Sequence, residues 1–110
     1  MSTIFDQMLA RYGDLPEGKL WNAKYEVTQQ IALAGLHRGG FFNKAAFYGG
    51  TCLRLFHYLK RYSEDMDFTL LVEDPTFHLE NYFQAVIDEF KLTGRYVTLT
   101  KKDKLTLGKV

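Results

Sequence analysis

Residues 47–71 read F-Y-G-G-T-C-L-R-L-F-H-Y-L-K-R-Y-S-E-D-M-D-F-T-L-L, and this stretch decides both the fold and the chemistry predicted for the chain. Gly49 and Gly50 stand between an apolar run typical of a strand and a run with helical spacing. Glycine lets the backbone approach a ligand, and the first N–H groups of a helix point outward toward an anion. The pattern predicts a phosphate-binding turn, although a glycine pair taken alone is more often a structural turn.

Two carboxylates follow the turn. Asp65 and Asp67 stand two positions apart in an apolar, strand-like run, so both side chains project from one face. Their Cα atoms are expected roughly 6.5–7 Å apart, which lets both bind one Mg²⁺ ion or bridge two. Such a pair taken alone is more often solvated, but Met66 and Phe68 favour burial, and buried carboxylates are costly without a cation. The glycine turn and the pair of carboxylates together predict metal-assisted phosphoryl or nucleotidyl transfer.

The composition fits one compact cytoplasmic domain. Of the 110 residues, 46% are apolar and 15% aromatic, which is enough for a hydrophobic core. The formal net charge of +1 gives no general attraction to nucleic acid or to membranes. Cys52 is the only cysteine, which excludes an internal disulfide and fits a reducing compartment. The sequence has no signal-peptide pattern and no apolar run near the roughly 20 residues of a membrane-spanning helix, so no membrane partner is expected.

Other phosphate-handling and metal-binding motifs are excluded. No G-x-x-x-x-G-K-[ST] motif follows the first predicted strand, so the turn is not a P-loop. A phosphatase loop built on Cys52 needs arginine at position 58, which holds Tyr58. The three histidines lie about twenty residues apart without a paired cysteine, which does not match the spacing of a zinc site.

Periodicity and turn signals predict an α/β (α+β) arrangement of helices covering a small sheet. Helices are predicted over residues 4–12, 20–38, 50–59 and 77–91, and strands over residues 45–48, 66–72 and 96–100. Ser2 or Thr3 is expected to cap the first helix, and Gly39-Gly40 to end the second. The chain is predicted to be a single domain, in which residues 1–40 form a helical cover and residues 41–110 form the core that carries both motifs.

The motifs resemble those of a known family. G-G-T-x-L-R, from Gly49 to Arg54, and R-Y-S-E-D-M-D-F, from Arg61 to Phe68, look like the signature of the AbiEii/AbiGii toxin family of nucleotidyltransferases. That family belongs to the DNA polymerase β-like nucleotidyltransferase superfamily, whose pattern is h-G-[GS], a spacer, then [DE]-h-[DE]-h. The resemblance is strong over residues 41–71, and the combination of motifs is far more specific than either half. It implies a nucleotidyltransferase-like small mixed β-sheet.

The resemblance also implies roles for individual residues. Gly49, Gly50 and Thr51 would hold the β- and γ-phosphates of a nucleoside triphosphate. Asp65 and Asp67 would bind Mg²⁺, in a site that allows two metal ions. The nucleotide would be transferred to an RNA such as tRNA or to a protein hydroxyl, in a toxin–antitoxin or phage-defence system with a cognate antitoxin.

Three further residues near the motifs are candidates for phosphate contact. Arg54 and Arg61 are cations placed to reach phosphate oxygens. For Arg54 an ion pair with Asp65 or Glu64 is an equally good interpretation. Ser63 matches the R-x-S-x-D pattern of the family, and hydrogen bonding to phosphate or to backbone fits it equally well.

The superfamily uses a third carboxylate on a later strand. Asp103 is the only acidic residue after Gly94, and it lies in a lysine-rich turn without the apolar flanks of a buried strand. We therefore expect the third acid beyond Val110, so that the chain is an incomplete domain, the N-terminal part of a longer protein, and inactive alone. The alternative is a catalytically inactive nucleotidyltransferase-like module that binds a nucleotide or a partner.

Overall fold

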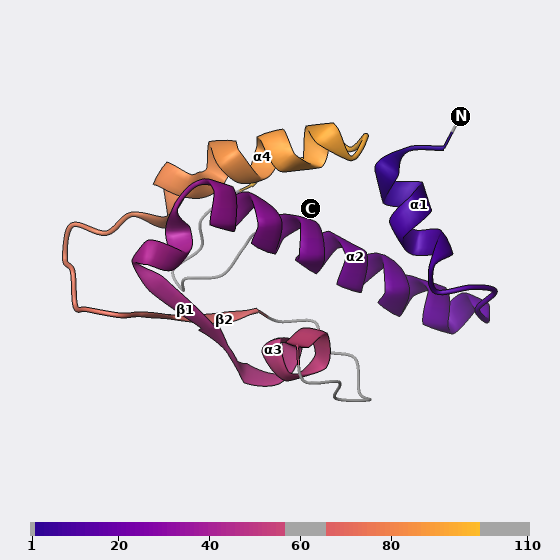
Figure 1. The fold of residues 1–110 in the computed structure, drawn as a ribbon, viewed down its shortest axis with the longest axis horizontal. Coiled ribbons are helices and arrows are strands. Elements are labelled where there is room, and N and C mark those ends of the chain that lie inside the picture. The colour runs from indigo at the N-terminus through magenta and orange to yellow at the C-terminus, as the bar shows by residue number, and fades with distance from the viewer. Residues whose placement is uncertain (1, 57–65, 100–110) are drawn as a thin grey trace.

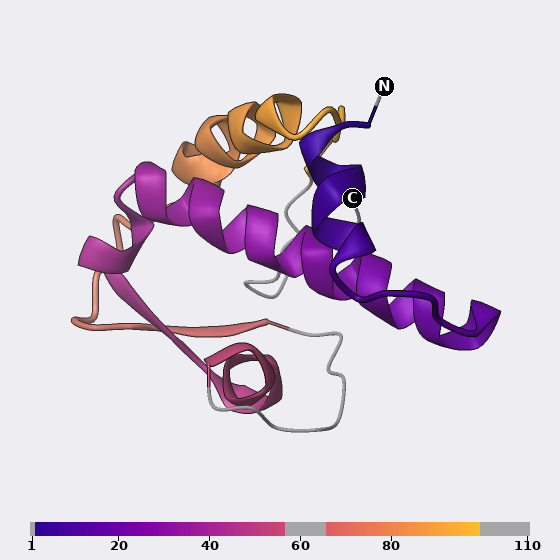
Figure 2. The same cartoon turned by 45° about the vertical axis from the view of Figure 1, so that its right-hand side comes forward.

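The computed structural model describes residues 2–56 and 66–99. In chain order the elements are α1 (Ile4–Ala10), α2 (Glu17–Arg38), the 3-10 helix η1 (Phe41–Asn43), β1 (Ala45–Tyr48), α3 (Gly49–Phe56), β2 (Asp67–Leu70), the 3-10 helix η2 (Leu79–Tyr82) and α4 (Phe83–Leu92). Helix α2 runs through the middle, with α4 along one side and the antiparallel pair of strands β1 and β2, together with α3, along the other (Figures 1 and 2). The predicted α+β class, a small sheet covered by helices, is confirmed.

The first two helices begin and end where local chemistry favours it. Thr3 caps α1, since its hydroxyl accepts from the Asp6 N–H at 3.1 Å while the Asp6 carboxylate accepts from the Thr3 N–H at 3.2 Å. Helix α2 begins at Glu17, three residues earlier than predicted, because the φ of −55° at Pro16 already suits a helix start. It ends at Arg38, and Gly40 then adopts a φ of +83°, which confirms the predicted stop at the glycine pair.

The helical layer is closely packed. A Cβ atom at Gly35 of α2 would lie 2.7 Å from the Cα atom of Val86 in α4, so the two helix backbones approach as only glycine allows. The residues of the buried core around this contact are mostly aliphatic and aromatic: Phe5, Val27, Ile31, Ala32, Leu36, Phe41, Ala45, Leu79, Val86 and Phe90. Burial of this apolar surface is the main source of stability of the fold.

Strands β1 and β2 pair antiparallel, with Ala45 opposite Leu70 and Tyr48 opposite Asp67. Directly opposed residues share a face of the sheet. One face carries Phe47 and Phe68, whose ring centroids lie 5.3 Å apart, and it packs toward the core. The other face carries Tyr48, Thr69 and Asp67, and both Tyr48 and Thr69 are exposed.

Two predicted elements differ from the structure. The strand predicted over residues 96–100 is wrong over 96–99, which have no regular secondary structure and no strand pairing among the described residues. Val97 and Leu99 pack against the core as partly buried side chains, so burial holds this segment where a strand ladder was expected. The helix predicted over residues 77–91 starts later, as η2, and becomes an α-helix at Phe83.

The second strand is shorter than predicted and covers Asp67–Leu70. The chain turns just beyond it, where the Asp74 carboxylate accepts hydrogen bonds from the Thr76 N–H at 2.9 Å and the Thr76 hydroxyl at 2.6 Å. These two bonds hold the pKa of Asp74 below its ordinary value. Within residues 2–56 and 66–99, no helix is both long and apolar enough to cross a membrane.

Candidate functional site

The predicted phosphate-binding turn forms at the junction of β1 and α3. Strand β1 ends at Tyr48, and α3 begins directly at Gly49, whose φ of +86° is a conformation that side chains other than glycine rarely adopt. Gly49 and Gly50 are both half-buried. The strand–glycine–helix arrangement predicted from the sequence is therefore confirmed, and it places the first N–H groups of α3 at the end of the sheet.

The structure brings Asp67 against this turn. A Cβ atom at Gly49 would collide with Oδ2 of Asp67 and would lie 3.2 Å from its Cγ atom. The contact follows from the strand register, because Asp67 stands opposite Tyr48, the residue before Gly49. A carboxylate at the N-terminus of a helix is also favoured by the helix dipole. Two motifs 18 positions apart in the sequence thus meet at one place.

Asp67 lies on the open face of the sheet. It is half-buried and shares this face with Tyr48, which is 52% exposed, and with Thr69. A ligand seated on this face could contact the Asp67 carboxylate and the backbone of the glycine turn together. Oxygen donors of this kind suit a hard cation such as Mg²⁺. The Asp67 carboxylate itself fills the position that a side chain at Gly49 would take, so the residues at the turn fit one side of a cation site.

Thr51 lies inside the turn. It is completely buried, at 0% exposure, whereas Gly49 and Gly50 before it are half-buried. This burial favours a role in supporting the turn over direct contact with a phosphate.

Arg54 has a partner that the sequence did not reveal. Its Nε donates to Oε2 of Glu26 at 2.8 Å, and its Nη2 lies 3.4 Å from Oε1 of the same carboxylate. Oε1 of Glu26 also accepts from the hydroxyl of Tyr12 at 2.6 Å. Glu26 and Tyr12 were not predicted as site residues. One signal was present: Glu26 lies three positions after Ala23 in the helix, the spacing of a buried stripe.

The remaining predicted site residues, Arg61, Ser63 and Asp65, lie outside the described residues. Glu64 and Asp103 do so as well, and the same-face arrangement of Asp65 and Asp67 stays a prediction. Among the described residues, no three histidine, cysteine, aspartate or glutamate side chains gather in a way that could hold a metal ion.

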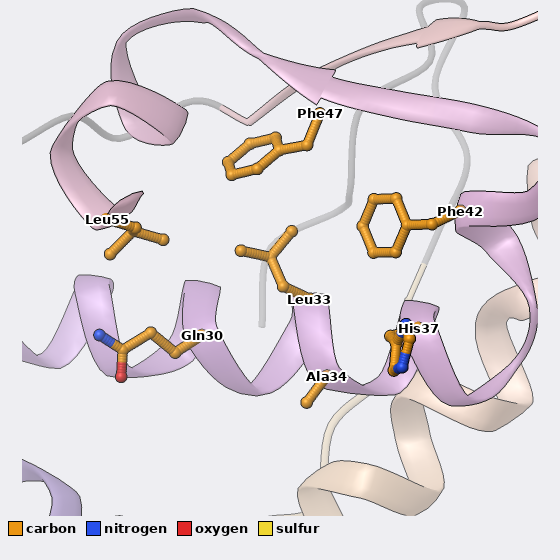
Figure 3. A pocket seen from close by; sticks show the side chains of 7 residues that line it. All are labelled: Gln30, Leu33, Ala34, His37, Phe42, Phe47 and Leu55. Carbon is orange, nitrogen blue, oxygen red and sulfur yellow. The ribbon is translucent and has the colours of Figure 1, made fainter. Parts of the chain in front are cut away.

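A cavity of about 560 Å³ lies elsewhere, between α2 and the β1–α3 unit (Figure 3). Leu33, Ala34, Phe42, Phe47 and Leu55 give it an apolar wall, and Gln30 and His37 add polar groups. Phe47 reaches it from the core face of the sheet, opposite to the face that carries Asp67. The cavity is thus separate from the glycine turn and its carboxylate.

A comparison with protein-family models matches residues 31–105, more than half of the chain, to the nucleotidyl transferase AbiEii toxin family of Type IV toxin–antitoxin systems. The match runs from the middle of α2 past α4 and includes both motifs. The resemblance inferred from the glycine pair and the two aspartates is therefore confirmed. No curated protein and no solved structure matches the chain.

Proposed function

The chain belongs to the family of AbiEii nucleotidyl transferase toxins, and on this basis we propose that it contributes to Mg²⁺-dependent transfer of a nucleotide from a nucleoside triphosphate to a hydroxyl of RNA or protein. The observation that carries the proposal is the contact of the Asp67 carboxylate with the backbone of Gly49. It supports a site in which an anionic ligand and a cation are held side by side.

Each side of this site has a separate task. The backbone at Gly49 and Gly50 binds phosphate oxygens through N–H groups at the start of α3, where the helix dipole favours negative charge. Asp67, with Asp65 as its expected companion, supplies carboxylate oxygens to the metal. When bound, Mg²⁺ neutralises phosphate charge and makes the α-phosphorus a better electrophile. Arg61 and Ser63 are proposed to contact phosphate from the segment before Asp65.

Transfer of labelled nucleotide tests the proposal. The whole gene product is incubated with Mg²⁺ and each of the four ribonucleoside triphosphates, and incorporation into total RNA and into protein is measured. We expect Asp67→Asn to lower the transfer rate at least about a hundredfold, the loss typical of removing one preorganised electrostatic contact, without changing the melting temperature. Asp88→Asn is the matched control, because Asp88 is an exposed carboxylate on α4.

The outcomes separate the two candidate functions. Undiminished transfer by Asp67→Asn contradicts the proposed site. If the wild-type protein binds Mg²⁺ and nucleotide without transferring it, and Asp67→Asn abolishes the binding, the result favours the nucleotide-binding module.

Membership of a toxin–antitoxin family also suggests a biological test. We propose that production of the active protein slows growth and that a cognate antitoxin encoded nearby restores it. Growth of cells that produce the Asp67→Asn variant should be unaffected, because the toxicity is attributed to nucleotide transfer.

A further inference from the structure

We propose that Glu26 is a positioning residue, which fixes the glycine turn of α3 through Arg54. The proposal deepens the function proposed above and rests on it for its relevance to catalysis. Glu26 lies on α2, to which the sequence assigns no chemistry, yet its side chain is only 8% exposed. The carboxylate is bound by Arg54 Nε at 2.8 Å, by Arg54 Nη2 at 3.4 Å and by the Tyr12 hydroxyl at 2.6 Å.

The burial of this carboxylate makes the contact specific. A buried charge is costly unless it is paired and hydrogen-bonded, so the energetically favoured position of Glu26 is the one that engages Arg54. A guanidinium that meets both oxygens of a carboxylate fixes orientation as well as distance. The Tyr12 hydroxyl holds Oε1 from the other side. The position of Arg54 relative to α2 is therefore set by a geometry-dependent contact.

Because Arg54 and the glycine turn belong to the same helix, a fixed position of Arg54 also fixes the position of the turn. Arg54 lies three and four residues after Thr51 and Gly50 in α3, so it stands one helical turn along the same side. In the described part of the chain, helix α3 covers Gly49–Phe56. Short helices in proteins take most of their stability from tertiary packing, so a contact such as that of Arg54 helps to hold α3 in place.

Apolar packing between α2 and α3 is incomplete beside the ion pair. Leu55, the residue after Arg54, and Gln30, one turn after Glu26, both line the cavity of about 560 Å³ (Figure 3). Because this space separates the two helices next to the ion pair, close packing between the described side chains of α2 and α3 does not set their distance there. The Glu26–Arg54 contact does so instead.

The residues that hold Arg54 precede the segment matched by the family model. That segment begins at residue 31, whereas Tyr12 and Glu26 lie in the first 30 residues. The N-terminal helices thus have a task beyond covering the sheet: they hold the turn against Asp67.

Amide hydrogen exchange in the whole chain, followed by NMR, tests the proposal. The N–H groups of Leu53, Arg54 and Leu55 bond to the first-turn carbonyls in an α-helix, so their exchange reports opening of the glycine turn. We expect Glu26→Gln to accelerate exchange at these amides about tenfold, since a charged hydrogen-bonded pair is lost. Exchange at Phe90 in α4 should stay unchanged.

Glu89→Gln is the matched control. It breaks the Arg38–Glu89 ion pair of 3.0 Å, which joins α2 to α4 and does not touch α3. We expect this variant to leave exchange in α3 unchanged. Equal acceleration in α3 and α4 by Glu26→Gln, or no acceleration in α3, overturns the proposal. If Glu26→Gln does not fold, Tyr12→Phe is measured in its place, because it removes one contact to Glu26 and keeps the ion pair. Faster amide exchange in α3 without a change at Phe90 in α4 is again the expected result, and any other pattern overturns the proposal.

Titration of the protein with Mg²⁺ and each ribonucleoside triphosphate distinguishes a failure of this proposal from a failure of the proposed function. A wild-type protein that binds none of them contradicts the function, while the exchange pattern still decides the role of Glu26. Where the wild type binds, Glu26→Gln should weaken the affinity by about tenfold at temperatures where it remains folded.

Discussion

Gly35 and Gly49 allow close contacts of opposite kinds in the two halves of the molecule. At Gly35 the backbone of α2 meets the backbone of α4 at Val86 in a buried, apolar layer. At Gly49 the backbone meets a carboxylate, Asp67, on a half-buried turn beside the open face of the sheet. The first contact holds the fold together, and the second creates a place where charge can be bound. Substitutions at the two glycines should therefore separate stability from function.

The largest effect is expected at the turn. Gly49→Ala imposes a left-handed backbone cost of about 1–2 kcal/mol on the free energy of unfolding, and its methyl group also displaces Asp67. If Asp67 binds the metal as proposed, displacing it by about 1 Å is expected to lower nucleotide transfer about a hundredfold. Thermal unfolding and the transfer assay measure the two effects.

Gly13→Ala is the control for Gly49→Ala. Gly13 has a similar φ of +73°, but a Cβ atom there would meet nothing within 4 Å. The variant should lose a similar amount of stability and keep full transfer. If both variants transfer equally well, the contact between Gly49 and Asp67 has no functional importance.

A smaller effect, confined to stability, is expected in the helical half. Gly35→Ala places a methyl group against the Val86 backbone, and overpacking outweighs the gain in helix propensity by about 1–2 kcal/mol. Gly18→Ala, in the same helix but with open space around it, should gain up to about 1 kcal/mol. Denaturant unfolding compares the pair, and equal stabilisation of both would show that α2 and α4 do not pack this closely.

The smallest effect concerns pH and the cap of α1. Hydrogen bonds from the Thr3 N–H and hydroxyl, together with the Arg95 charge, hold the pKa of Asp6 below its ordinary value. Because the pKa of Asp6 is lower in the folded state than in the unfolded state, its ionised carboxylate stabilises the fold at pH values above the ordinary carboxyl range. This contribution is lost as the pH falls through the folded-state pKa. Asp6→Ala should slightly lower the melting temperature at pH 6 and have no effect at pH 2. An equal difference in melting temperature between Asp6→Ala and the wild type at both pH values would show that the ionised Asp6 carboxylate does not stabilise the cap.

The sequence predicted the local features of the site and missed its tertiary contacts. Residues 45–48 and the glycines after them were predicted correctly, because strand, turn and helix signals there are all local. The contact of Gly49 with Asp67 depends on the pairing of β1 with β2, which the local signals of the two motifs did not predict. The roles of Asp65, Arg61 and Ser63 remain predictions, since these residues lie outside the described part of the chain.

What the sequence could not predict depended on contacts between distant residues. Glu26 and Arg54 are 28 positions apart, and no spacing rule within one helix links them. The strand predicted over residues 96–100 had the right β-forming side chains, but a strand also needs a partner, and Val97 and Leu99 pack against the core without one among the described residues. Local propensity was overridden by packing in this segment.

Paramagnetic broadening by Mn²⁺ tests the central claim most directly, because carboxylates and phosphates that bind Mg²⁺ also bind Mn²⁺. NMR spectra of the chain are recorded with Mn²⁺ and a nucleoside triphosphate, for the wild type and for Asp67→Asn. If the glycine turn and Asp67 form one site, the amide signals of Gly49, Gly50 and Asp67 broaden first, and Asp67→Asn abolishes the effect. Broadening that begins elsewhere, or that is unchanged in Asp67→Asn, would contradict the claim.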